Sequence, residues 1–173
     1  MRLYRGQVPA IAEEMTKSLM ESGDIEVEPA NVGEVQLDIE AVLNEYRRVD
    51  YEILEQAKDA VAQRGLDYSH TNKIRQRLAE KRGFGVGDKA YDWILSQLIE
   101  ALLHSRNVEE IFGEDNALRK QMKDVLRRYT DVDRDMDRQV RARIKNLEEG
   151  DQNWEIEYQK VMGDLRQRRG LGE

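Results

Sequence analysis

The stretch that most constrains the fold of this chain runs from Glu34 to Arg64 and contains no proline. Its apolar residues recur with alternating spacings of three and four, which places them along one face of a long helix. This stripe, interrupted only at Gln56, consists of Ile39, Val42, Tyr46, Val49, Ile53 and Ala60, widened by Leu43, Leu54, Ala57 and Val61. We therefore predict a helix about 46 Å long, at about 1.5 Å per residue, that packs against more than one neighbour.

The same pattern returns between Ala117 and Leu147 and predicts a second long helix, with Asp115 as its N-cap and Gly150 as its stop. Its stripe consists of Met122, Val125, Tyr129, Val132, Met136, Val140, Ile144 and Leu147. Shorter stripes predict four more helices, within residues 9–22, 70–82, 88–103 and 154–169. Residues 24–29 and 108–113 are predicted to be extended connectors, because a single short strand has no partner to complete a sheet.

The chain also resembles itself when it is shifted by 83 positions. The string VLxxYxxVD occurs at Val42–Asp50 and again at Val125–Asp133, and the predicted connectors coincide as well. After a small insertion near Gly150 the shift becomes 87, which places AEKRGFG at Ala79–Gly85 over RQRRGLG at Arg166–Gly172. We predict an all-α fold in which a short-long-short three-helix unit is duplicated in tandem, as residues 1–87 and 88–173. The six helices are expected to form one elongated bundle around the two long helices, with the glycine-rich segment Gly83–Asp88 as a flexible hinge.

The amino-acid composition argues against several kinds of site and of protein. The chain has no cysteine, which excludes disulfides, a thiol nucleophile and thiolate metal sites. The longest apolar-rich run, Trp93–Leu103, is too short to cross a bilayer, and no apolar segment follows the basic N-terminal residues. We therefore expect a cytoplasmic location and no membrane partner. The net charge of −7 disfavours bulk binding to nucleic acid.

Several strings spread along the chain carry a resemblance that covers essentially its whole length: MRLYRGQVPAI at the start, KRGFGVGD at the hinge, QLIEALLHSR in the fourth helix, and RARIKNLEEG with WEIEYQKVM near the end. On these strings the chain resembles the bacterial family called domain of unknown function 507. The resemblance implies a bacterial, helical, cytoplasmic protein. It implies no activity, cofactor or functional residue.

Three patterns resemble known sites but lack required residues. Asp131, Asp133 and Asp135 have the spacing of a calcium loop, without its glycine and glutamate. Gly83–Asp88 lacks the Gly-Lys-Ser/Thr ending of a phosphate loop. Glu100 and His104 could share a metal only with a second Glu/His pair. We therefore predict no metal, no cofactor and no enzymatic activity, although residues that form no motif could still assemble a pocket.

Two rows of charge repeat every seven residues along the predicted long helices. The acids Asp38, Glu45, Glu52 and Asp59 flank the apolar stripe of the first helix, and the bases Lys120, Arg127, Arg134 and Arg141 lie opposite that of the second. We call the second set the basic row. With the C-terminal Arg166, Arg168 and Arg169, it is the candidate surface for an anionic partner, although solubility and helix-dipole effects explain such charges too.

Two functions are consistent with this surface. The first is a non-enzymatic scaffold or adaptor that binds another protein through the faces of its long helices, with a homodimer as a further alternative. The second is an RNA- or ribosome-associated protein that uses the basic row and the C-terminal arginines. The sequence favours the first function and does not identify the partner.

Overall fold

The structure, a computed structural model, describes residues 3–147 and 152–169. Its helices are α1 (Val8–Glu21), α2 (Val32–Gln63), α3 (Thr71–Lys81), α4 (Ala90–His104), α5 (Asp115–Arg143) and α6 (Gln152–Arg168). Two short strands, β1 (Ile25–Glu26) and β2 (Glu110–Ile111), are present as well. The all-α class and the two long helices are confirmed. Gly150, the predicted stop of the second long helix, lies outside the described residues.

The order of the elements runs twice through the chain. A short helix, a strand, a long helix and a short helix occur as α1, β1, α2 and α3, and again as α4, β2, α5 and α6. Glycines with positive φ follow the first three helices, at Gly23, Gly65 and Gly83, as glycine stops should. The repeated order agrees with the predicted short-long-short unit, whereas an origin by duplication stays a prediction.

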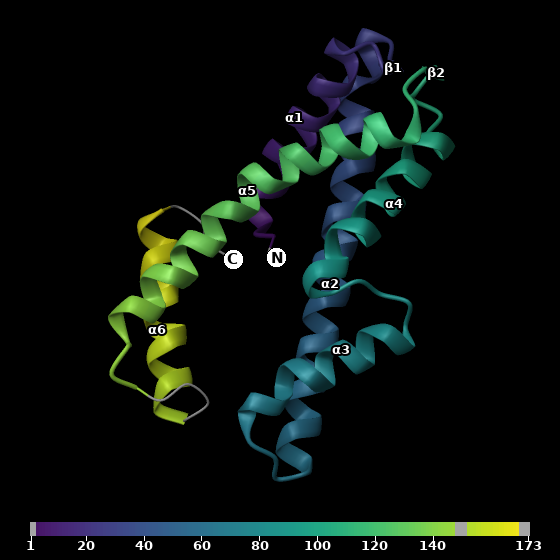
Figure 1. Ribbon diagram of the computed structural model, residues 1–173. Helices are drawn as coiled ribbons and strands as arrows, with labels where there is room; N and C mark the ends of the chain where they lie inside the picture. Colours follow the sequence, from purple (N-terminus) through teal and green to yellow (C-terminus); the bar gives the residue numbers. More distant parts are fainter. Residues whose placement is uncertain (1–2, 148–151, 170–173) are drawn as a thin grey trace.

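The two short helices α1 and α4 join the halves. Each of them packs against both long helices, whereas α2 and α5 have little contact with each other along their described lengths. Figure 1 shows that α2 and α5 diverge from this shared end and form two arms. We call the C-terminal part of α2 with α3 the α2 arm (residues 46–81), and the C-terminal part of α5 with α6 the α5 arm (residues 129–168). The halves therefore cover each other at one end of the molecule only.

Burial along α2 follows the helical period and not the strict seven-residue repeat. The fully buried positions are Val35, Ile39, Leu43, Tyr46, Ile53, Ala57 and Val61. Val42 and Val49, which the seven-residue pattern places in the seam, are only partly buried. The helices α1, α3 and α4 contact α2 from several sides, so the buried positions of α2 spread around the helix. A strict seven-residue repeat is expected where a helix packs along a single partner helix.

The glycine-rich connection between the halves is tightly packed, and the prediction of a flexible hinge is wrong. Phe84 and Val86 are buried, and the Phe84 ring lies 5.0 Å from that of Tyr46 and 4.7 Å from that of Trp93. A Cβ atom added to Gly85 would lie 2.3 Å from the carbonyl oxygen of Lys89. Glycine occurs here because the backbone approaches the start of α4 closely.

The two connectors pair with each other, which corrects the prediction that neither has a strand partner. β1 and β2 are antiparallel, with Ile25 opposite Ile111 and Glu26 opposite Glu110. The backbone N–H groups of Phe112 and Gly113 donate to the Asp24 carbonyl at 2.9 and 3.0 Å. Each connector therefore completes the other, and together they tie the two halves at the shared end.

The α5 arm has a small core of its own. It consists of Tyr4, Met136, Val140, Ile144, Trp154, Met162 and Leu165, separate from the main core. The helix α5 ends at Arg143, so the prediction that it continues to Leu147 is wrong. Ile144 leaves the helical conformation, at φ −101° and ψ 19°, and its buried side chain packs in this core. The chain turns at this point because α6 covers the end of the stripe.

Candidate functional site

The exposed face of α5 carries the basic row. The predicted apolar stripe is buried at Met122, Val125, Met136 and Val140, which turns the opposite side of the helix toward solvent. All members of the row, Lys120, Arg127, Arg134 and Arg141, are exposed. The sequence therefore located this basic face correctly.

Members of the row differ in their ionic partners. The Nε of Arg141 lies 2.9 Å from the Asp137 carboxylate, and Arg134 lies 3.8 Å from Asp131. Over the described parts of the chain, the side chains of Lys120 and Arg127 have no ion pair. Exposed pairs contribute only about 0–1 kcal/mol, so Arg134 also remains available for an incoming anion.

Two shallow hollows open along this face. The α6 hollow, of about 440 Å³, is lined by Arg134, Asp137, Arg138, Arg141 and Tyr158. The second hollow, of about 280 Å³, is lined by Gly87, Asp88, Tyr91, Lys123, Arg127, Thr130 and Arg134. We call it the hinge hollow because Gly87 and Asp88 belong to the segment that the sequence predicted as a hinge. Arg134 lines both, so the two hollows follow each other along α5.

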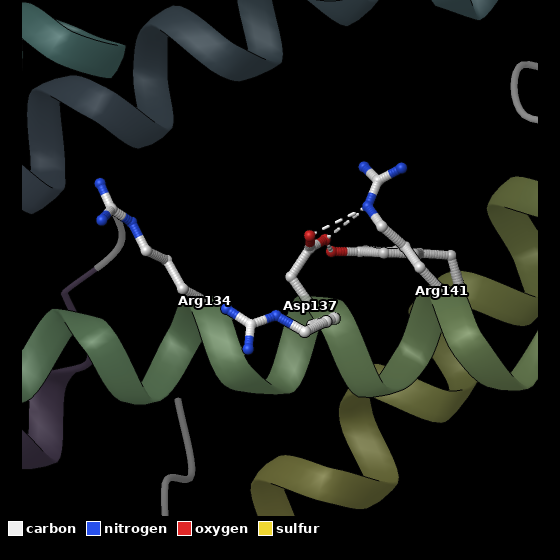
Figure 2. A pocket seen from close by; sticks show the side chains of 5 residues that line it. Arg134, Asp137 and Arg141 are labelled. Carbon is white, nitrogen blue, oxygen red and sulfur yellow. Dashed lines mark hydrogen bonds and ion pairs between the residues drawn. The ribbon is translucent and has the colours of Figure 1, made fainter.

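The side chains that line the α6 hollow largely contact other side chains of the protein. Figure 2 shows the Asp137 carboxylate held by Arg141, whereas Arg134 points away from this pair. The Tyr158 hydroxyl donates to the same carboxylate at 2.6 Å. The Arg141 guanidinium also lies 5.4 Å from the centre of the Trp154 ring. These contacts dock α6 onto α5, so Arg141 has a structural role beside any role in binding.

The hinge hollow has fewer internal contacts. Lys123 lies 5.8 Å above the Tyr91 ring. The Tyr91 hydroxyl lies 2.5 Å from Oγ1 of Thr130, and this buried hydroxyl donates to the Leu126 carbonyl at 3.1 Å. Sequence reasoning missed Lys123 and Thr130 because it followed the seven-residue row. The usable signal is the spacing of four, three and four from Lys123 to Arg134, which places these side chains on one stripe.

The C-terminal arginines lie apart from both hollows. Arg166 is half-buried, donates from Nε to the Tyr4 hydroxyl at 3.1 Å, and lies 5.1 Å from the centre of the Tyr4 ring. It therefore fastens α6 to the N-terminal segment. Arg168 and Arg169 are exposed at the end of α6. Only Arg127, Arg134 and Arg141 of the predicted site residues line the hollows.

The calcium-like pattern and the Glu/His pair both lie on helices and form no metal site among the described residues. The segment Asp131–Asp135 lies inside α5, where a helix replaces the loop that calcium requires. The side chains of Glu100 and His104 are exposed at the end of α4, 3.6 Å apart. Within residues 3–147 and 152–169, no group of three or more His, Cys, Asp or Glu could hold a metal ion.

The whole chain can be compared with known proteins. A family model described as "Protein of unknown function (DUF507)" matches residues 1–171. The chain belongs to this family. A search of curated proteins finds no match. In this DUF507 member, none of the helices in the described parts is both long and apolar enough to span a bilayer.

Proposed function

We propose that the protein is a non-enzymatic, cytoplasmic adaptor that binds an acidic segment of a partner protein along the exposed face of α5. The observation that supports this most is the basic row, whose cations lie beside two open hollows on a rigid helix. Helices position binding side chains more accurately than loops do. The row supplies charge for steering the partner, and the hollows accept its side chains.

The distribution of charge favours a protein over a nucleic acid. In the C-terminal half of α5, acids alternate with the arginines, as Asp131 beside Arg134, Asp135 beside Arg138 and Asp137 beside Arg141. A phosphate backbone is uniformly negative, so each of these carboxylates would repel it. A protein segment that is acidic overall but carries a few basic side chains can satisfy both signs. Tyr158 adds an aromatic side chain of the kind that is enriched in protein interfaces.

Site-specific crosslinking tests this proposal. A photo-reactive amino acid at position 127 should capture a defined partner, whereas the same amino acid at position 64, on the α2 arm, should not. With the purified partner, the double variant Arg127→Glu and Arg134→Glu should weaken binding at least about tenfold. Arg64→Glu, which replaces an exposed cation at the C-terminal end of α2, is the matched control and should leave binding unchanged. Equal effects of the two changes would contradict the proposal.

RNA is the second candidate, supported by Lys120 and Arg127 on the N-terminal half of the row, which form no ion pair with any residue that the structure describes. Its test is an electrophoretic shift with RNA at low and moderate salt, because phosphate-driven binding falls steeply with salt. Changing Arg127, Arg134 and Arg141 to glutamate should abolish the shift. A shift that persists in this triple variant would exclude the row as the RNA-binding surface.

A further inference from the structure

The hinge hollow has the composition of a small anion site. Three cations, Lys123, Arg127 and Arg134, line it together with one carboxylate, that of Asp88. The formal charge of its lining is therefore +2, from three positive groups and one negative group. Its volume of about 280 Å³ is at the lower limit of small-molecule sites, which measure roughly 300–1,000 Å³. The hollow suits an oxyanion and is small for a nucleotide.

The backbone positions that carry its charged groups are fixed by the fold. Lys123, Arg127 and Arg134 project from one stripe of α5, and Asp88 and Gly87 come from the packed connection before α4. The buried Thr130 and its 2.5 Å contact with Tyr91 join α5 to the start of α4 beside the hollow. Because neither element is a free loop, the backbone positions from which the charged groups project are set before an anion enters.

The carboxylate of Asp88 determines which oxyanion fits. A carboxylate repels an anion that carries no hydrogen, but it accepts a hydrogen bond from one that does. At neutral pH, inorganic phosphate retains at least one proton, whereas sulfate has none. A guanidinium group can bind two oxygens of an oxyanion through paired N–H donors, and an ammonium group such as that of Lys123 adds a point charge.

The geometry points to a binding site for inorganic hydrogen phosphate in the hinge hollow, with Lys123, Arg127 and Arg134 holding its oxygens and Asp88 accepting a hydrogen bond from its hydroxyl group. This site does not depend on the macromolecular partner proposed above. It shares Arg127 and Arg134 with the basic row but includes Lys123 and excludes Lys120. That difference separates a built site from general attraction by the basic face.

Isothermal titration calorimetry with inorganic phosphate, in a buffer without phosphate or sulfate, tests the inference. Wild-type protein should bind one phosphate in a saturable manner. Lys123→Gln and Arg127→Gln should each weaken binding about 10- to 100-fold, the range expected for losing one charged hydrogen bond. Lys120→Gln removes the same charge from the same helix outside the hollow and should leave binding unchanged. Circular dichroism of each variant checks that the helices remain.

A second titration, with sulfate, tests the role of Asp88. Wild-type protein should bind sulfate at least about tenfold more weakly than phosphate, and Asp88→Asn should remove most of this preference, because an amide can also donate. The absence of saturable phosphate binding, or equal losses in Lys120→Gln and Lys123→Gln, would overturn the site. Equal affinity of wild-type protein for the two anions would overturn the role of Asp88. If the protein binds phosphate but no macromolecular partner is found, this inference stands and the adaptor proposal fails.

Discussion

The two arms have the same order of elements but are held together differently. In the α2 arm, Tyr46 joins Phe84 and Trp93 in an aromatic cluster that belongs to the main core. In the α5 arm, Trp154 and Tyr158 belong to a separate small core. The α2 arm is therefore continuous with the shared end of the molecule, and the α5 arm is an attached unit.

The charged rows differ in the same way. On α2, Asp38 accepts hydrogen bonds from Ser105 and Asn107, and Glu52 pairs with Arg48 and Arg82. Most acids of this row are therefore paired with other side chains of the protein. On α5, Lys120 and Arg127 have no acidic partner in the part of the chain that the structure describes. The comparison teaches that members of a seven-residue charge row are available for binding only where the fold leaves them unpaired, as at Lys120 and Arg127 among the described residues.

Removing the Phe84 ring should have the largest effect on stability. Phe84→Ala deletes a buried ring that touches both Tyr46 and Trp93 and should lower the free energy of unfolding by about 3–5 kcal/mol. Urea unfolding followed by circular dichroism should show the whole main core shifting together. A loss confined to α3 would break the comparison, because the α2 arm would then be a separate unit.

Removing the Trp154 ring should have a smaller and local effect. Trp154→Ala opens the core of the α5 arm, and we expect α6 to detach at a cost of about 2–3 kcal/mol, near the lower limit for such changes. Proteolysis should then cut within residues 144–169 while the main core stays resistant. Unfolding of the entire chain in one step, as for Phe84→Ala, would contradict a separate arm.

Replacing Arg166 tests how α6 is fastened to the N-terminal segment. Arg166→Met keeps the apolar stem but removes the hydrogen bond to Tyr4 and the contact with its ring. The expected loss is about 1 kcal/mol, measured by the thermal midpoint of α6. Arg168→Met is the control, since Arg168 is exposed. Equal effects would assign the loss to general charge removal.

The smallest effect at neutral pH is expected for Tyr46→Phe. The buried Tyr46 hydroxyl has no hydrogen-bond partner among the described residues. A buried hydroxyl without a partner opposes folding, so its removal should leave stability unchanged or raise it by up to about 1 kcal/mol. Burial first, and then nearby Asp50, raise the pKa of Tyr46 above its ordinary value of 10.0. Because the folded state holds this proton more tightly, its contribution is complete below pH 10 and is lost as the pH rises further.

Denaturation at several pH values therefore checks the Tyr46 prediction. Wild-type protein should lose more stability than Tyr46→Phe above about pH 10. Other tyrosines and lysines titrate there as well, but they do so in both proteins. Identical losses in the two proteins would show that the Tyr46 hydroxyl is solvated.

Much of the fold could be predicted from local patterns. Apolar spacing located the helices because amphipathic helices bury one face, and glycines such as Gly65 marked their ends because positive φ suits glycine. The pairing of Ile25 with Ile111 could not be predicted, since two-residue strands have no distinctive pattern and their partner is distant in sequence. Gly85 suggested flexibility, but the close approach of the Lys89 backbone is a tertiary feature.

The candidate site could be predicted only in part. The row was visible because exposed charges repeat along α5, and Arg127 and Arg134 do line the hinge hollow. The inclusion of Lys123 and Asp88 depends on where the connection before α4 meets α5, which no local pattern specifies. Arg166 was predicted to face a partner, but its ring contact depends on Tyr4, at the other end of the chain.

Native-state hydrogen exchange, followed by mass spectrometry, tests most directly whether the α5 arm is a unit attached to a shared core. Amides of α6 and of the C-terminal part of α5 should exchange together and faster than those in the middle of α2, because their core is smaller and separate. Added denaturant should open the α5 arm before the remainder of the molecule. Equal protection of the two arms, with opening only in global unfolding, would contradict the account.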